Sequence, residues 1–433
     1  MAAGYANRKM ITFFSKATRD SINAIELGGS FKWLMDIHWA LHDDRMLFLT
    51  ANDLYERFTI WTIKLDGTRQ HQIIEHNTHL YSPRWATGGQ AIYYLRSTDN
   101  LKVDLMKIKV SRINGMAIGK PITLQTGLDT FGFSLSNDNK KLVYTKRLSF
   151  SNLSLVTLDN AGKESLRTEE LTSGTAGYYD PNISPDGNLV AFTSQGNVFT
   201  MPINGGETKQ VSFFPEAELI SIGPPSWSPD SREIAFSYKN GIWRAPLNGD
   251  ASRIHDSVTV YTELAWASKT EILYQRPGYQ NFHFLNLQSE EERPLVANDS
   301  VGWMSRPCIS PDGETVAVFW NRKRQLGKDG IWLIPIAGGH RTLLLEGESS
   351  WHPIQWSVDG RILYAWNYMA HPKEIIKIPV DGGEPETFLT LPFDNITPLG
   401  ITMTPDGKSI VCSVEETVSD VWMIENFDPE IEN

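Results

Sequence analysis

The sequence holds few of the residues that build crosslinks and thiolate metal sites. It has two cysteines in 433 residues, Cys308 and Cys412. No C-x-x-C spacing occurs, which excludes a metal site of that kind. The two cysteines fall in repeats that are not neighbours in the pattern described below, so we expect no disulfide between them.

Positive charge and long apolar runs are also scarce. The formal net charge is −11, and the one basic cluster, at 321–328, is interpreted as a solvated loop. We therefore expect no nucleic-acid partner. No apolar run approaches the roughly 18 residues of a membrane helix, and the first residues lack the apolar region of a signal peptide. No membrane span is predicted, and these residues assign no compartment.

The common catalytic motifs are missing. The string nearest to a G-x-S-x-G elbow, Gly132 to Ser136, lacks the final glycine. Neither a G-x-x-x-x-G-K-[ST] loop nor an H-E-x-x-H helix is present. The sequence therefore favours a protein that is not a self-contained enzyme, and we predict no cofactor and no metal site.

What the sequence does have is a recurring turn, Ser-Pro-Asp-Gly. It stands complete at 184–187 and 310–313, with near copies at 228–231, 357–360 and 404–407. Proline presets φ at the second position, aspartate bonds to the local backbone, and glycine accepts positive φ. Short strands rich in β-branched and aromatic residues flank each turn, which is typical of a hairpin between two strands.

The turns recur with a regular period. The residues that directly precede them are Trp39, Trp85, Leu135, Ile183, Trp227, Trp266, Ile309, Trp356 and Met403. They lie 39 to 50 residues apart, and about four short strands fit in each period. This spacing predicts an all-β fold, a single closed β-propeller of four-stranded blades. The count predicts nine blades, or eight if the weak copy at Leu135 is misread.

Incomplete repeats at both ends predict how the ring closes. The last module has three strands, and the N-terminal segment reads as later strands of a repeat that lacks its first. We therefore predict one propeller domain over 1–433, in which 1–34 supply closing strands, 35–427 form nine modules and 428–433 are a tail. Closure in this way would remove an exposed sheet edge.

The turn, the Ile-Trp strands at 242–249 and 331–339, and the Gly-Gly turn that follows the second of them resemble the TolB-type propeller repeat. That repeat also builds the propellers of dipeptidyl peptidase IV-like and tricorn-like proteases and of oligogalacturonate lyases. The ending 419–428 resembles the end of propellers attached to bacterial protein kinases and regulators. The resemblance implies the fold, a sensor part of a larger bacterial protein, and a periplasmic or extracellular location. It marks function poorly, since unrelated activities share the repeat.

A ligand site is predicted where the chain enters each innermost strand, because these ends converge on the channel mouth. The candidate ligand-binding residues are Asp36, Asp180, Glu263, Arg306 and His352, with Tyr179, Tyr261 and Trp351 as stacking surface. Carboxylates, an arginine and a histidine at one mouth would suit a polar ligand, and the aromatics a sugar ring or peptide. The alternative is a ring of polar residues that only hydrates the channel.

Two functions follow from these observations. The first is a non-enzymatic binding or scaffold propeller, expected to be a monomer, that presents its channel mouth to a protein, peptide, carbohydrate or other small ligand. The alternative is a polysaccharide lyase or hydrolase of the oligogalacturonate lyase type. Those lyases use histidine ligands to a divalent metal, whereas this sequence places His352 alone at the mouth. Binding is therefore the favoured function.

Overall fold

Hairpins built on the recurring turn organise the strands. In the computed structural model, Ser184 Oγ donates to Asp186 Oδ1 over 2.6 Å and accepts the backbone N–H of Leu189 over 2.9 Å. The same serine–aspartate bond recurs at Ser310 and Ser357, at 2.6 Å in both. Each serine thus holds the turn closed from both sides, which fixes where the first strand ends and the second begins.

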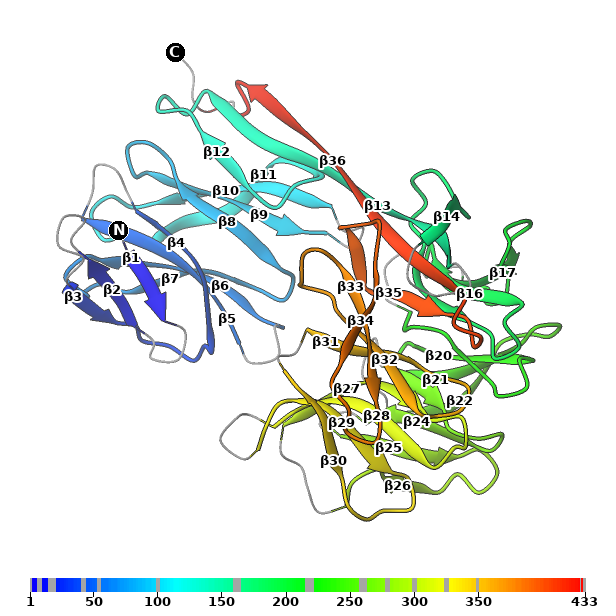
Figure 1. The fold of residues 1–433 in the computed structure, drawn as a ribbon. Helices are drawn as coiled ribbons and strands as arrows, with labels where there is room; N and C mark the ends of the chain where they lie inside the picture. The colour runs from blue at the N-terminus through cyan, green and yellow to red at the C-terminus, as the bar shows by residue number, and fades with distance from the viewer. Residues whose placement is uncertain are drawn as a thin grey trace. The chain divides into compact units, whose positions relative to one another are not determined.

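The structure describes most of the chain. The described residues are 2–5, 10–14, 21–39, 44–52, 56–98, 102–158, 165–214, 222–256, 263–276, 281–297, 302–322, 327–347, 350–428 and 430. They are all-β, and their strands form nine sheets: seven of four strands, one of five and one of three (Figure 1). No helix among them is long and apolar enough to cross a membrane.

The chain divides into two compact units, residues 1–148 with 418–433, and residues 149–417. In the first unit the three-stranded sheet is β1 (Ala2–Tyr5), β2 (Met10–Phe14) and β3 (Ser21–Glu26). Two four-stranded sheets follow, β4 (Trp33–Trp39), β5 (Arg45–Ala51), β6 (Phe58–Lys64) and β7 (His71–His76), then β8 (Leu80–Trp85), β9 (Ala91–Ser97), β10 (Val103–Val110) and β11 (Ala117–Leu128).

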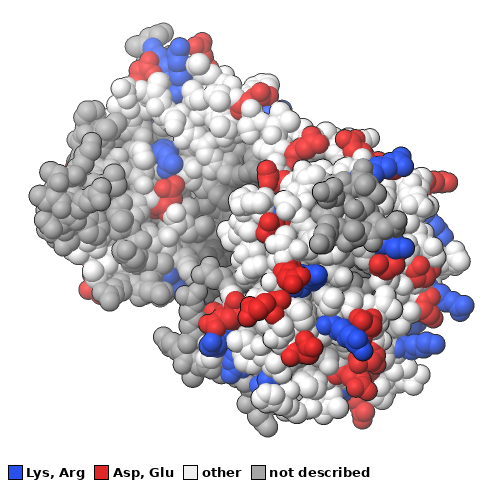
Figure 2. Space-filling model, in the orientation of Figure 1, with Lys and Arg blue, Asp and Glu red and all other residues white. Residues whose placement is uncertain are grey.

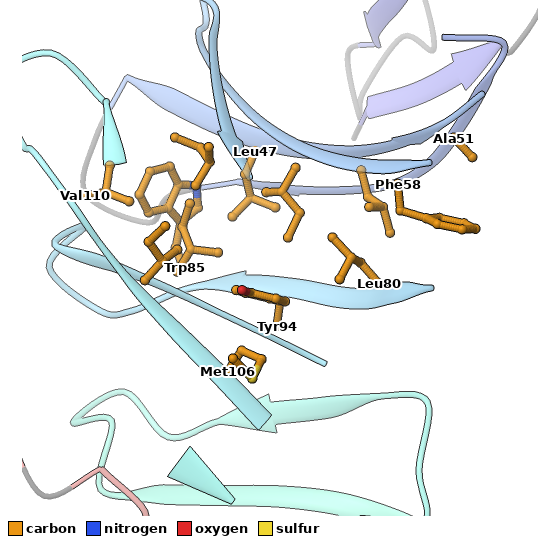
Figure 3. Close-up of a cluster of buried hydrophobic side chains, with 13 residues drawn as sticks. Leu47, Ala51, Phe58, Leu80, Trp85, Tyr94, Met106 and Val110 are labelled. Atoms are coloured by element: carbon orange, nitrogen blue, oxygen red, sulfur yellow. The ribbon is translucent and has the colours of Figure 1, made fainter. Parts of the chain in front are cut away.

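These two sheets pack face to face on a buried cluster. Leu47 and Phe58 come from one sheet, and Trp85 and Tyr94 from the other. Figure 3 shows these side chains pointing toward one another between the ribbons. All four are at most 5% exposed, so the burial of large apolar surface holds the two sheets together.

The second unit holds five four-stranded sheets in chain order. Their strands are β15 (Tyr179–Ile183), β16 (Leu189–Ser194), β17 (Asn197–Pro202), β18 (Lys209–Gln210), β19 (Ser226–Trp227), β20 (Glu233–Tyr238), β21 (Gly241–Pro246), β22 (Ser252–Asp256), β23 (Leu264–Trp266), β24 (Glu271–Gln275), β25 (Phe282–Asn286), β26 (Glu292–Pro294), β27 (Trp303–Ile309), β28 (Thr315–Asn321), β29 (Gly330–Pro335), β30 (Thr342–Glu346), β31 (Trp351–Trp356), β32 (Ile362–Asn367), β33 (Glu374–Pro379) and β34 (Glu386–Thr390).

A five-stranded sheet joins distant parts of the sequence. It contains β12 (Phe133–Leu135), β13 (Lys141–Leu158), β14 (Ser165–Glu170), β35 (Ile396–Met403) and β36 (Ser409–Glu425), in the order β12-β13-β36-β35 with β14 paired to β13. β13 and β36 are long, and each continues from one unit into the other. Within the second unit the sheet therefore runs β35-β36-β13-β14, with one pair of strands from each end of residues 149–417.

The pairing of the terminal strands differs from the expected closure by 1–34. Among the described strands, β1, β2 and β3 pair with one another, and β35 and β36 pair with β13 rather than with the N-terminal segment. The physical reason is that β12 and β14 occupy only one edge of β13, so its other edge is open along its whole length and pairs with β36, from Lys140–Asn426 to Leu158–Lys408. One domain over 1–433 and nine blades in one ring stay predictions.

Neighbouring sheets of the second unit pack on apolar clusters. Leu153 of β13 and Phe192 of β16 share one cluster, and Val156 of β13 and Trp366 of β32 share another. The sheet β35-β36-β13-β14 thus packs against the β15 sheet on one side and the β31 sheet on the other. Similar clusters join each remaining consecutive pair of sheets.

Charge on the described surface is mixed. Figure 2 shows Lys and Arg side chains interspersed with Asp and Glu on the face that is drawn.

Candidate functional site

A cavity of about 700 Å³ lies among the first strands of all six sheets in the second unit. Residues of β15, β19, β23, β27, β31 and β35 line it, together with the turns that follow these strands. Each first strand contacts the next in this order, and β35 contacts β15. The cavity therefore lies where six strand ends meet, on the side of the Ser-Pro-Asp-Gly turns.

Indole hydrogen bonds of two tryptophans link neighbouring first strands in the cavity wall. Trp227 Nε1 donates to the backbone carbonyl of Asn182 over 2.9 Å, and Trp356 Nε1 donates to that of Cys308 over 3.0 Å. Each indole thus joins its own first strand to the first strand of the preceding sheet. The backbone N–H of Ile183 also donates to Thr402 Oγ1 over 3.3 Å, which links β15 to β35. These bonds make the wall a set of mutually fixed strands.

The lining mixes polar and apolar groups and is nearly neutral. Besides serine, threonine and five prolines, the residues that set its chemistry are Trp227, Trp266, Trp356, Lys269 and Asp312. The hydroxyl of Ser310 and the backbone N–H of Glu314 hold the pKa of Asp312 below its usual range, so this carboxylate is ionised at neutral pH. The negative charge of Asp312 balances the positive charge of Lys269 in the lining. The cavity therefore suits a ligand of little net charge.

The potential nucleophiles of the lining are engaged or unactivated. The Ser310 hydroxyl donates to Asp312 and accepts the backbone N–H of Thr315 over 2.9 Å. Cys308 is half-buried, and burial raises the pKa of its thiol to about 12. A thiol with such a pKa is almost entirely protonated at neutral pH and is a weak nucleophile.

Two predicted site residues are brought together just before the cavity-lining part of their first strands. Arg306 Nε lies 3.5 Å from Glu263 Oε1, and the backbone N–H of Arg306 donates to the same carboxylate. Arg306 Nη2 also donates to the backbone carbonyl of Pro398, in β35, over 3.2 Å. The guanidinium thus pairs within the protein and reaches past β31 to the next first strand.

Asp180 and Arg306 share an unusual backbone. Both lie at a bulge of their first strand and adopt left-handed φ, 53° and 58°. Ser82 has φ 44° at the bulge of β8. Asp180 is 6% exposed and accepts the hydroxyl of Thr193 over 3.3 Å. The repeat alignment therefore selected a recurring structural position, which in β15 and β27 lies one or two residues before the part of the strand that lines the cavity.

None of the predicted residues that the structure describes lines the cavity. His352 is 6% exposed and stacks on the ring of Tyr368, with centroids 4.7 Å apart. Trp351 packs in the cluster between the β27 and β31 sheets. Tyr179 is 37% exposed, and Tyr261 lies outside the described residues.

Asp36 belongs to the first unit, whereas the other predicted residues belong to the second. It pairs there with Arg84 Nη1 at 3.0 Å. The predicted set is therefore divided between two units. The ligand-binding role of these eight residues stays a prediction.

Sequence reasoning missed the lining tryptophans as site residues. Trp227, Trp266 and Trp356 were used as markers of the repeat, directly before each turn. A tryptophan at that position in five modules, three of them in the second unit, was the available signal.

No family model matches the sequence, and no curated protein matches it. Among solved structures, a protein assigned as TolB from Agrobacterium tumefaciens has TM-score 0.47 and 18% identity, covering 62% of this chain and 99% of that one. A nidogen/laminin complex has TM-score 0.42 and 12% identity, covering 55% of this chain and 93% of that chain. Tricorn protease has TM-score 0.32 and 12% identity, covering 90% of this chain and 49% of that chain. The likeness concerns fold alone, and at that level the chain resembles TolB-type β-propellers.

Proposed function

We propose that residues 149–417 form a six-bladed propeller and that its channel is a binding site for a segment of another protein. The observation that carries the proposal is the cavity of about 700 Å³ surrounded by six first strands. Its volume lies within the range of ligand sites, roughly 300–1,000 Å³. The contact between β35 and β15, and the apolar clusters on both sides of the β35-β36-β13-β14 sheet, support closure of the ring.

The lining favours a peptide of little net charge. Tryptophan and proline surfaces pack against apolar side chains, and hydroxyls and backbone groups supply hydrogen bonds to a main chain. A segment that runs along the channel would meet Glu263 and Arg306 directly beyond the lining residues Ala265 and Pro307. These two residues, predicted from the sequence, therefore belong to the proposed site. The polysaccharide lyase alternative gains no supporting observation.

Peptide display on the immobilised protein tests the proposal. Selected peptides should bind the wild type and lose binding to Ala265→Trp, because the indole would fill the cavity that Ala265 lines. Ala337→Trp is the matched control, since Ala337 is exposed in the turn after β29. Bound peptide should also slow alkylation of Cys308, which lines the cavity, while the fully buried Cys412 serves as an internal reference. Equal binding to Ala265→Trp and wild type would refute the channel site.

A further inference from the structure

A second cavity, of about 330 Å³, lies in the sheet β35-β36-β13-β14 of the second unit. β13, β14 and β36 line it, together with the loops 173–175 and 391–395 that flank β14 and β35. It shares no lining residue with the channel cavity. A site here is therefore independent of the channel.

Strand register places its polar groups on one face. Ser154 of β13 is the direct antiparallel partner of Glu170 of β14, so their side chains lie side by side. Phe150 precedes Ser154 by four residues on β13 and faces the same side, because side chains alternate along a strand. Glu416 contributes a second carboxylate from β36.

The cavity carries negative charge without compensation in its lining. Glu170 and Glu416 are both exposed, and no lysine or arginine is among the lining residues. In the part of the chain that the structure describes, neither carboxylate forms an ion pair. Two carboxylates at one small cavity repel each other, and a cation between them would relieve that repulsion.

A buried hydroxyl supplies the second observation. Ser154 lines the cavity and is 6% exposed, and its side chain has no hydrogen-bond partner among the described residues. A ligand N–H group in the cavity would provide that partner.

Aromatic rings complete the lining. Phe150 and Phe393 come from β13 and from the loop before β35. Phenyl faces attract organic cations and also pack against short alkyl chains. An inorganic cation would use only the oxygen ligands of the lining, whereas an alkylammonium group matches the carboxylates, the hydroxyl and the rings together.

We propose that this cavity binds an alkylammonium group. Glu170 and Glu416 neutralise the charge, Ser154 accepts an ammonium N–H, and the two phenylalanines cover the adjoining methylenes. Two kinds of ligand carry such a group: a free primary amine and the side chain of a lysine.

Saturation-transfer NMR on the full chain tests the site with defined probes. n-Hexylammonium and Nα-acetyl-lysine amide represent the two sources, and n-hexanol is the uncharged control. We expect both ammonium probes to bind and n-hexanol to bind at least about fivefold more weakly, the effect of a charge-assisted hydrogen bond. Tighter binding of n-hexylammonium would assign a free amine, and tighter binding of the lysine amide a protein side chain.

Variants locate the binding. Glu170→Gln and Glu416→Gln should each weaken binding of the ammonium probes about fivefold or more. Glu169→Gln is the matched control, because Glu169 pairs opposite Leu155, faces the other side of β14 and contacts Arg167. The control should change affinity less than about twofold, because the Glu169 carboxylate points away from the cavity and is already paired with Arg167. Equal losses in Glu169→Gln and Glu170→Gln, equal binding of n-hexanol, or no binding of either ammonium probe would overturn the proposal.

Discussion

The indole of Trp356 donates a hydrogen bond of 3.0 Å to the backbone carbonyl of Cys308. This bond crosses from β31 to β27, the first strands of two neighbouring sheets, and Trp227 makes the equivalent bond to Asn182. Hydrogen bonds within a sheet cannot hold separate sheets in register. The recurring indole therefore fixes how one sheet sits against the next and shapes the cavity wall.

Removal of this donor should destabilise the protein. Trp356 is 5% exposed, so Trp356→Phe leaves the Cys308 carbonyl buried without its partner. We expect a loss of about 1–3 kcal/mol in the free energy of unfolding, measured by urea denaturation. Trp422→Phe, at a position that is 48% exposed, should cost less than about 0.5 kcal/mol. Equal effects of the two changes would show that the bond contributes nothing specific.

Gly313 should be needed for its positive φ and not for lack of space around a side chain. Gly313 has φ 73°, as predicted from the sequence, and a Cβ at this position would meet no atom within 4 Å. Gly313→Ala should therefore cost about 1 kcal/mol from the left-handed conformation, and Gly313→Val somewhat more. Urea denaturation gives both values. The equivalent Ser231 adopts φ 58°, so a side chain here is strained rather than forbidden.

A buried charge cluster fixes the C-terminal segment in the first unit. Lys107 is 5% exposed and contacts both Asp428 and the exposed Glu430, while the Tyr93 hydroxyl donates to Asp428. Asp428→Ala leaves a buried ammonium with only Glu430, and we expect the free energy of unfolding to fall by about 3–5 kcal/mol.

The double substitution Lys107→Met with Asp428→Leu separates charge from packing. It removes both buried ions, and most of the lost stability should return. If Asp428→Ala alone is as stable as the wild type, the cluster is not a stabilising contact.

His38 should make stability depend on pH. Its Nδ1 accepts the backbone N–H of Trp85 over 3.2 Å. Burial, followed by the charge of Arg84, lowers the pKa of His38 from 6.5 to about 4, although Asp36 opposes the shift. The unfolded chain thus binds this proton more tightly. The contribution is fully present above pH 6.5 and is lost as the pH falls toward 4.

His38→Gln provides the comparison. The difference in urea midpoint between wild type and His38→Gln should be constant above about pH 7 and should change as the pH falls below about 6.5. A difference that stays constant through the acidic range would contradict the lowered pKa.

The repeat could be predicted from local sequence, but the closure could not. The turn at 184–187 requires only residues next to one another, and β16 begins at Leu189, as the apolar string 189–192 indicated. β13 pairs with β36, more than 250 residues away, and nothing in residues 141–158 shows which partner they take. Strand pairing over such a separation depends on the three-dimensional fold rather than on local pattern.

The candidate site was predicted in part. Alignment of the repeats chose equivalent positions correctly, because Asp180 and Arg306 share a bulge and a left-handed φ. It could not show that Arg306 is engaged by Glu263, since that contact depends on how two side chains meet across neighbouring sheets. The lining tryptophans were visible in the sequence, but their direction became known only with the strand pairing.

Because β13 and β36 each continue from one unit into the other, the two units are arranged along the sequence in a particular order. The second unit is encoded without interruption, and its two ends meet where the hydroxyls of Ser149 and Thr417 lie 3.2 Å apart. The first unit is encoded in two pieces on either side of it. The second unit is thus inserted within the sequence of the first, and a short hairpin joining residue 148 to 418 would reconnect the two pieces of the first unit.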